Sequence, residues 1–255
     1  MTAAAARTAV PVSWRLTWAT ARRVLTQLRH DPRTVVMLIA VPSVLMILLR
    51  YVLNNPVALD RFAPEFIGVF PFIIMFIIAA VTTQRERARG TLERLMAMPL
   101  GKLDLLGGYA IAFGLVACCQ VGLVLAISLT WLGVRLPGSV VPLVVIAVLD
   151  ALLGMSLGLF ASAFARTEFQ AVQFMPAFVL PQALLCGIIV ARSQMTGVLR
   201  WLSDVLPLSY AVDAMQQISA GASWSGPVTT DVGIILAFTV AALVGGALTL
   251  RRRTR

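Results

Sequence analysis

Few side chains in this sequence could take part in chemistry, and one acidic residue inside an apolar run stands out among them. Asp150 lies within the run 140–165. If that run crosses a bilayer, an ionised carboxylate near its centre costs roughly 2.5 to 3.5 kcal/mol or more, so the group must be protonated, paired or exposed to water. Either Asp150 belongs to a proton or substrate path, or it is a packing group satisfied by Ser156, Gln120 or a neighbouring helix.

The cysteines and the single histidine do not form a recognisable site. Cys118, Cys119 and Cys186 lie within apolar runs and form no CxxC pair, which argues against a disulfide framework and a zinc site. His30 is the only histidine, and a lone histidine is a poor basis for acid–base catalysis. We therefore predict no catalytic, cofactor-binding or metal site.

The sequence also lacks a phosphate-binding loop. Lys102 follows Gly101, but Met96 and Leu103 occupy the positions where the GxxxxGK[ST] template requires Gly and Ser or Thr. We expect the chain not to be an enzyme and to bind no ATP itself.

Composition indicates the solvent in which the chain folds. Of its 255 residues, 59% are hydrophobic and 13% are charged, and the mean hydropathy is +0.90, whereas soluble domains are about half apolar and a quarter charged. The net charge of +10 comes from basic residues beside apolar runs, not from a basic surface with interleaved aromatic residues, so nucleic acid is not an expected partner. The composition predicts an all-α polytopic protein of the cytoplasmic membrane.

Runs long enough to cross a bilayer, which takes about 20 helical residues, set the expected topology. Six such runs lie at 34–53, 66–83, 103–132, 140–165, 169–191 and 229–250. With both termini inside, sixteen basic residues fall on the cytoplasmic side and five on the outer side. Because basic residues favour cytoplasmic loops, we expect six transmembrane helices with the N- and C-termini inside.

Residues 13–29 have the pattern of a helix that lies in the membrane interface. Apolar residues recur along one stripe, and arginines repeat every seven residues along its border, as in helices that rest on headgroups. The expected interface residues are Trp14, Arg15, Trp18, Arg22, Leu25 and Arg29. The alternative is a solvated leader that is amphipathic by chance.

The segment 84–99 is predicted to be a short charged helix between the second and third runs. Ala88, Leu92, Leu95 and Met96 give it an apolar face at i, i+4, i+7 and i+8. Pro99 ends the helix. Such a helix rests either on headgroups or in the groove of a soluble cytoplasmic subunit.

The outer segment 192–227 is too apolar for an ordinary loop. It carries two short helical patterns interrupted by Pro207. This arrangement favours a re-entrant helical hairpin that dips into the outer leaflet before the last run, which is allowed when its backbone is paired or packed on protein.

The order Arg85-Glu86-Arg87-x-x-Gly90-Thr91-Leu92-Glu93-x-Leu95-x-x-x-Pro99 resembles the coupling-helix motif of ABC-2 type transporter permeases. The stretch containing Pro207, Tyr210 and Ala214 is similar to a Pro-x-x-Tyr-x-x-x-Ala stretch at the same place in those permeases. The resemblance covers nearly the whole chain and implies a single ABC-2 type transmembrane domain over 1–255. It implies that the coupling helix rests in a cleft of a nucleotide-binding subunit, with docking residues Arg85, Glu86, Arg89, Gly90, Thr91, Leu92, Glu93, Leu95, Met96 and Pro99.

The resemblance implies a permease subunit of an ABC exporter that moves a small amphiphilic compound, such as a drug, antibiotic or lipid-like molecule. ATP and Mg²⁺ would be bound by a partner ATPase, and a second permease would complete a homodimer or heterodimer in the lipid bilayer. The implied pathway follows the first, second and fifth runs. Residues considered for the pathway or a gate are Asp150, Gln120, Gln173, Pro181, Gln182, Pro207 and Tyr210.

Two other functions remain open at this point. The chain could be a proton-coupled secondary transporter that uses Asp150, although no internal repeat is evident. The chain could also be a non-transporting membrane anchor for an ATPase.

Overall fold

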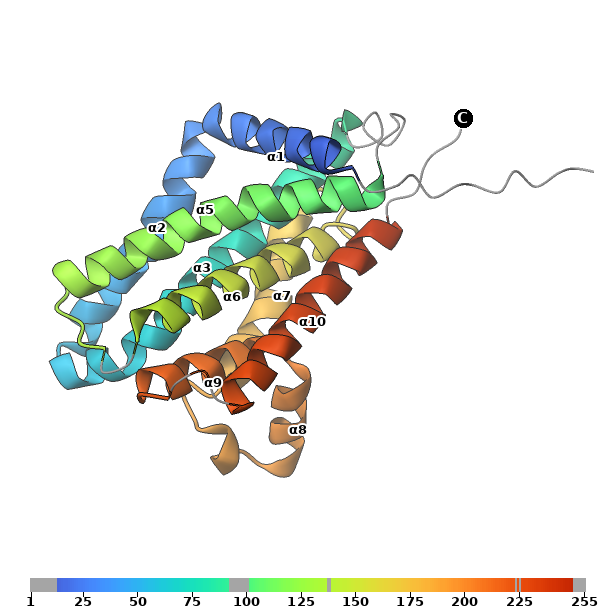
Figure 1. Ribbon diagram of the computed structural model, residues 1–255. Helices are drawn as coiled ribbons and strands as arrows, with labels where there is room; N and C mark the ends of the chain where they lie inside the picture. The colour runs from blue at the N-terminus through green and yellow to red at the C-terminus, as the bar shows by residue number, and fades with distance from the viewer. Residues whose placement is uncertain (1–12, 92–100, 137–138, 223, 225, 250–255) are drawn as a thin grey trace, which may run out of the picture.

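A computed structural model of the chain describes residues 13–91, 101–136, 139–222, 224 and 226–249. Within these ranges every regular element is helical (Figure 1). The elements are α1 (Trp14–Arg29), α2 (Pro32–Leu53), α3 (Pro56–Ala88), α5 (Lys102–Thr130), α6 (Val140–Ala161), α7 (Glu168–Leu185), the 3₁₀ turn η1 (Arg192–Gln194), α8 (Gly197–Val205), α9 (Pro207–Ser219) and α10 (Gly226–Thr249).

Five of the described helices are long and apolar enough to cross a membrane: α2, α3, α5, α6 and α10. They correspond to five of the six predicted runs. The remaining prediction, a span over 169–191, differs from the structure, because α7 ends at Leu185. The helix also contains three glutamines, Glu168 and two prolines, so its composition is less apolar than that of the other five.

Capping residues determine where α2 and α3 begin. The Asp31 carboxylate accepts a hydrogen bond from the Thr34 amide at 3.2 Å, and Pro32 occupies the first helical position. Asn55 accepts from the amides of the second and third residues of α3, and Pro56 occupies its first position. Proline suits this position because its missing N–H has no partner there.

These caps explain a difference from the predicted second span, 66–83. The helix α3 begins at Pro56, ahead of Phe66, because the Asn55 cap starts it there. At the other end it continues through Gln84 to Ala88. The first residues of the predicted coupling helix 84–99 are therefore the last turn of α3.

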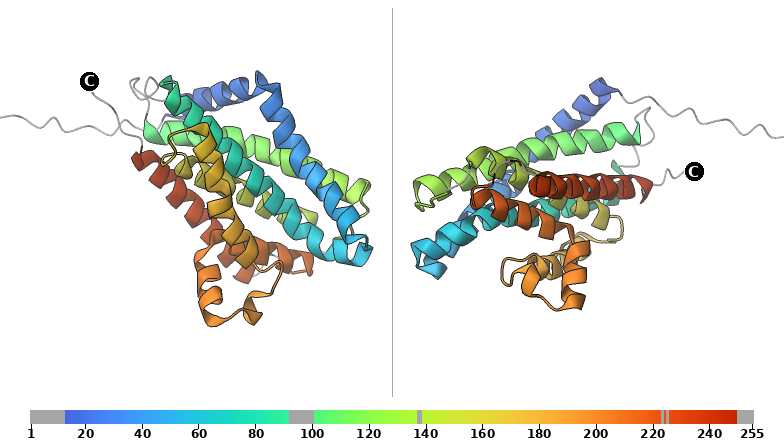
Figure 2. Two further views of the ribbon diagram at one scale, coloured as in Figure 1. Left: turned by 180° about the vertical axis from the view of Figure 1, so that it is seen from behind. Right: turned by 60° about the horizontal axis from the view of Figure 1, so that its bottom comes forward.

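The helix α3 lies at the centre of the bundle. It packs against α2, α5, α6, α7 and α9, and the view from behind shows α2 and α7 on its two sides (Figure 2). Phe72, Met75 and Phe76 on this helix are fully buried. Consequently, a movement of α3 would displace most of the other long helices.

The contact between α3 and α6 is made backbone to backbone. Gly154 and Gly158 of α6 lie over the carbonyl groups of Phe72 and Phe76, and a Cβ atom at either glycine would overlap the corresponding carbonyl oxygen. The sequence places these glycines one turn apart, and small residues at this spacing permit close helix packing. Glycine is required at both positions because any side chain would push the helices apart.

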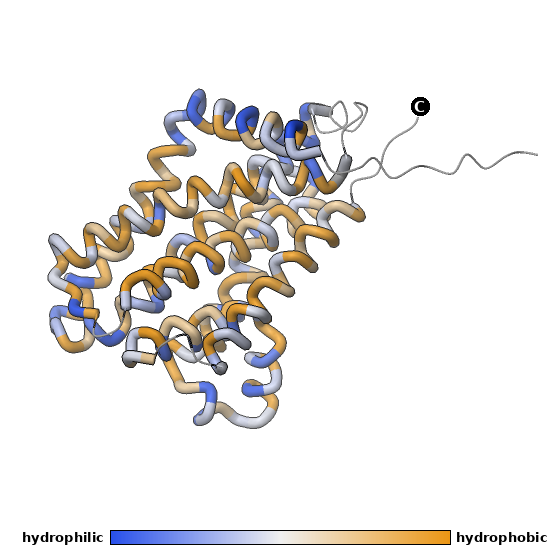
Figure 3. Tube along the Cα trace, in the orientation of Figure 1, coloured by the Kyte–Doolittle hydropathy of each residue, from blue (hydrophilic) through white to orange (hydrophobic). Residues whose placement is uncertain are grey.

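The polar residues lie mainly at the two ends of the bundle. In Figure 3 the middles of the long helices are mostly hydrophobic, and hydrophilic residues gather on α1 and around the helix ends. The helix α1 lies across the upper end in Figure 1, alongside the first half of α5. At the opposite end, α8 and α9 meet at Pro207, the predicted break between two short helices.

Replacing Gly158 by alanine should lower the free energy of unfolding by about 1 to 3 kcal/mol, because the new methyl group overlaps the Phe76 carbonyl oxygen. The measurement is the unfolding temperature of purified protein in detergent. Gly122→Ala is the matched control, since no atom lies within 4 Å of a Cβ placed at Gly122. Equal unfolding temperatures for the two variants would contradict the close contact.

Candidate functional site

The C-terminal end of α3 carries two neighbouring charged residues that face different helices. Arg85 and Glu86 are consecutive, so their side chains leave the helix about 100° apart. Both lie in the last turn of α3, directly before the turn at Arg89 and Gly90. Together they join the end of α3 to four other helices.

Glu86 ties α3 to α1 and α5. Its Oε1 atom lies 3.2 Å from Nη1 of Arg23, and its other carboxylate oxygen accepts a hydrogen bond from the Tyr109 hydroxyl. The Nη2 atom of Arg23 also donates to the Tyr109 oxygen at 3.3 Å. Glu86 and Tyr109 are buried, and charged hydrogen bonds are stronger when they are shielded from water.

Arg85 ties α3 to α2 and α7. Its Nε and Nη2 atoms donate to the two carboxylate oxygens of Glu168 at 3.0 and 2.9 Å, which is a bidentate pair. Its Nη1 atom lies 3.7 Å from Oδ2 of Asp31. Asp31 also caps α2, and hydrogen bonds from Thr34, supported by the Arg85 charge, lower the pKa of the Asp31 carboxyl group.

The turn after these residues requires glycine. Gly90 has a φ of +67°, a left-handed conformation that residues with a Cβ atom rarely adopt. The helix therefore ends before Gly90, and Ala88 belongs to α3, while its predicted apolar partners Leu92, Leu95 and Met96 lie outside the described residues. Glu93 and Pro99 lie outside them as well.

Two cavities meet at Arg85. One, of about 290 Å³, lies between α1, α2 and the end of α3 and is lined by Gln27, Asp31, Arg85, Glu86 and Arg89 among others. The second, of about 270 Å³, is an apolar groove between α2 and α3, with Val172 of α7 at its edge. Apolar side chains form most of its lining: Met37, Val41, Ile74, Ile77, Ile78 and Val81.

The predicted interface helix is α1, and it packs on α5. The face of α1 that contacts α5 is adjacent to the apolar stripe predicted from the sequence. Thr17, Thr20, Ala21 and Val24 are its buried residues, and Gly108 of α5 lets the backbone of α1 approach. Trp14 and Trp18 are 71% and 52% exposed. Of the predicted interface residues, Arg15, Arg22 and Arg29 are exposed too, and Leu25 is half-buried.

A second anchor holds the start of α1. The Asp104 carboxylate accepts a hydrogen bond from the Ser13 amide at 2.7 Å and another from the Thr17 hydroxyl at 3.1 Å. Asp104 lies in the first turn of α5 and is fully buried. Thus both ends of the α1–α5 contact are fixed by acidic side chains.

The residues considered for a pathway or gate do not form one site. Gln120 is buried in α5 and donates to the Leu38 carbonyl of α2 at 2.8 Å. Gln173 and Pro181 are exposed on α7. Gln182, Pro207 and Tyr210 lie instead where α7 meets α8 and α9, with the Leu208 amide 3.4 Å from the Gln182 side-chain oxygen.

Asp150 is fully buried, and neither carboxylate oxygen has a hydrogen-bond partner within the described part of the chain. The predicted partners are wrong, since Ser156 donates to the Leu153 carbonyl and Gln120 to the Leu38 carbonyl. The carboxyl group instead lies beside Gly68 of α3. Ionising a buried acid without a partner is costly, because the charge would be unsolvated.

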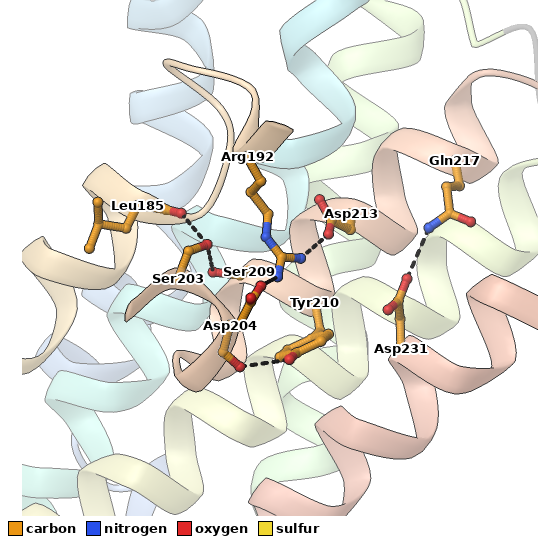
Figure 4. A network of polar contacts seen from close by, with 9 residues as sticks. All are labelled: Leu185, Arg192, Ser203, Asp204, Ser209, Tyr210, Asp213, Gln217 and Asp231. Atoms are coloured by element: carbon orange, nitrogen blue, oxygen red, sulfur yellow. Dashed lines mark hydrogen bonds and ion pairs between the residues drawn. The ribbon is translucent and has the colours of Figure 1, made fainter. Parts of the chain in front are cut away.

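An ion-pair network connects η1, α8 and α9 (Figure 4). Arg192 forms ion pairs with Asp204 at the end of α8 and Asp213 in α9. The Tyr210 hydroxyl donates to the Asp204 carbonyl at 2.6 Å. The Ser203 hydroxyl donates to the Leu185 carbonyl at 2.7 Å, which connects α8 to the end of α7.

Several of these residues were missed in the sequence. Arg23 lies opposite the apolar stripe of its helix, a position that by itself indicates exposure to solvent and not an ion pair with Glu86. Asp31 before Pro32 is a helix-start signal. By contrast, the pairing of Arg85 with Glu168 joins residues that are 83 positions apart, and no local pattern reveals it. Among the described residues, no cluster of His, Cys, Asp and Glu could hold a metal ion.

Comparison with known proteins places the chain in a family. A family model described as ABC-2 type transporter matches residues 15–219. The chain is 26% identical over 204 residues to the probable multidrug ABC transporter permease YbhS of Escherichia coli strain K12, covering 79% of this chain and 54% of YbhS. It is 28% identical over 155 residues to the probable multidrug ABC transporter permease YbhR of the same strain, covering 61% of this chain and 42% of YbhR.

The linearmycin resistance permease protein LnrN of Bacillus subtilis strain 168 is 25% identical over 185 residues, covering 71% of this chain and 48% of LnrN. The chain thus spans about half the length of these relatives. Because the family model matches most of the chain and the described residues contain five apolar helices of membrane-spanning length, the chain belongs to the ABC-2 type transporter family and is a multi-pass permease of the cell membrane.

Proposed function

We propose that this chain is the membrane-spanning subunit of an ATP-driven exporter that moves a small amphiphilic compound of drug or antibiotic type outward. ATP and Mg²⁺ bind to a separate ATPase subunit, on which the segment 84–99 rests. A second permease, either another copy or a related chain, completes the transporter. The similarity to permeases named for multidrug transport and linearmycin resistance supports this cargo class.

The junction at Arg85 and Glu86 carries the proposal. These residues stand directly before the segment that would contact the ATPase, and they are bonded to α1, α2, α5 and α7. A displacement of the segment therefore reaches all four helices through short polar contacts. ATP binding favours one access state because the ATPase holds the coupling segment differently in the two states.

The apolar groove between α2, α3 and α7 is the proposed path. Its lining is almost entirely apolar, which suits an amphiphile. Arg85 stands at one end of this groove and also lines the neighbouring polar cavity. The ion pairs of Arg85 with Asp31 and Glu168 thus close the groove toward the cytoplasm, and their rearrangement opens it.

Helix α7 is the proposed sixth crossing. It extends from Glu168, which is paired with Arg85, to Leu185, which accepts from Ser203 of the outer segment. Its 18 residues correspond to a length of about 27 Å, near the thickness of the hydrocarbon core. Both termini then face the cytoplasm, and α8 and α9 form a hairpin in the outer leaflet.

Reversing the charge at Arg85 tests the junction. Arg85→Glu places a third carboxylate beside Asp31 and Glu168, so ATP-driven export should fall roughly tenfold or more, and Arg85→Glu with Glu168→Arg should recover part of it. The measurement is substrate export in proteoliposomes containing the ATPase. Arg200→Glu, a reversal on the exposed face of α8, is the control. Wild-type export by Arg85→Glu would contradict the proposed function.

Two adjacent arginines of α1 allow a matched comparison. Arg23→Gln removes the partner of the buried Glu86, so substrate should no longer stimulate ATP hydrolysis by the reconstituted complex. Arg22→Gln, which changes an exposed side chain, should leave the stimulation intact because Arg22 does not contact Glu86. The proposal is unsupported if both variants retain the same stimulation.

Asp150 separates this proposal from proton-coupled transport. Asp150→Asn exchanges a neutral buried acid for a neutral amide, so ATP-driven export should persist at close to the wild-type rate. The competing function predicts uptake driven by a pH gradient in vesicles that lack the ATPase. If that uptake occurs and Asp150→Asn abolishes it, the chain is a secondary transporter.

A further inference from the structure

A large cavity lies at the outer end of the bundle, away from the Arg85 junction. Its volume is about 570 Å³, within the range of sites that hold drug-sized ligands. We call it the outer vestibule. Four parts of the chain line it: the first turns of α3, Arg135 between α5 and α6, the segment 187–194 and the end of α9.

The wall of the vestibule is held in place by charge pairs. Arg192 connects the segment 187–194 to Asp213 of α9, as Figure 4 shows. Gly187 has a φ of +100° and lies against the side chain of Arg192. Because these contacts fix the wall, the cavity is formed before a ligand enters.

One acidic group in the vestibule has a carboxylate oxygen without a hydrogen-bond partner among the described residues. Glu65 of α3 is 3% exposed, and its Oε2 atom has no hydrogen-bond partner. The side chain of Gln216 lies within hydrogen-bonding reach of the carboxyl group, and none of the ion pairs within the described residues involves Glu65. A buried oxygen that is left unsatisfied carries a desolvation cost, which a ligand can offset by donating a hydrogen bond to it.

Asp60, Arg61 and Arg135 also line the vestibule, and the charge of Arg61 acts on Glu65. The Asp60 carboxylate accepts a hydrogen bond from the Arg135 amide at 2.8 Å. The Arg61 guanidinium lies over the ring of Phe62, 5.5 Å from its centre. Among the described carboxylates of this cavity, Glu65 is thus the one with a buried oxygen that has no hydrogen-bond partner.

We propose that the outer vestibule binds the cationic head of an amphiphile, with an ammonium group donating to Glu65 and an apolar portion along Phe62, Ile188 and Ile189. The ammonium charge offsets the buried carboxylate, and the apolar wall takes the tail. This inference rests on the proposed export function. It narrows the cargo to basic amphiphiles and assigns the vestibule to the outward-facing stage of transport.

The test compares two fluorescent probes with the full chain in lipid nanodiscs. Both carry a dansyl group on the same alkyl chain, which ends in a primary ammonium in one probe and in a hydroxyl group in the other. We expect wild-type protein to bind the ammonium probe more tightly, and Glu65→Gln to weaken that binding roughly tenfold or more. Binding of the hydroxyl probe should change little, which also reports that the variant is folded.

Two further variants complete the design. Asp60→Asn keeps an oxygen that can accept from the Arg135 amide, so it should retain the preference for ammonium and serves as the matched control. Ala220→Lys adds a cation at an exposed position of the lining and should reduce the preference without touching the core. The inference is wrong if neither Glu65→Gln nor Ala220→Lys alters the preference for the ammonium probe. It is also wrong if wild-type protein binds both probes equally. The probe-binding measurement uses no ATP. It can therefore be interpreted even if the chain does not export substrate.

Discussion

The packing of α3 on α6 is the contact on which the other features of this structure depend. Gly154 and Gly158 bring α6 onto the backbone of α3, so neither helix can slide without separating the pair. In a membrane, where lipid is as apolar as leucine, such close packing replaces the hydrophobic effect as the force between helices. The pair forms a stiff centre, and α2, α5, α7 and α9 are arranged around α3.

The length of α3 gives this centre two chemically different ends. Its 33 residues extend for about 50 Å, well beyond a hydrocarbon core of about 30 Å. Its N-terminal half carries Glu65 in the outer vestibule, and its C-terminal end carries Arg85 and Glu86. Packed helices can carry energetic coupling between distant sites when they have two discrete arrangements. In the proposed function, the long helix is the physical route between the coupling segment and the vestibule.

The sequence predicted the positions of the helices well and the side-chain contacts between them poorly. The physical reasons for the two outcomes differ. Apolar runs and caps such as Asn55-Pro56 are local, and hence five of the six predicted runs correspond to apolar helices of spanning length, although the starting point of α3 was wrong. The spacing of Gly154 and Gly158 is also local, and small residues so spaced permit the close contact seen between α6 and α3. The partners of Glu86 depend on how α1 and α5 lie in space, which no spacing along the chain encodes. Arg23 and Tyr109 were missed for this reason.

Asp150 and Glu65 are two buried acids of the bundle whose surroundings differ. Their surroundings, and not the residue type, indicate what each can do. Asp150 lies beside Gly68, one turn of α3 beyond Glu65, so the two carboxyl groups approach the same stretch of that helix. The described residues around Asp150 offer its carboxylate oxygens no hydrogen bond. Glu65 instead borders a cavity of about 570 Å³, in which the ammonium group of a ligand can donate to its unpaired oxygen. One buried acid is thus enclosed by packed helices, whereas the other is open to a ligand.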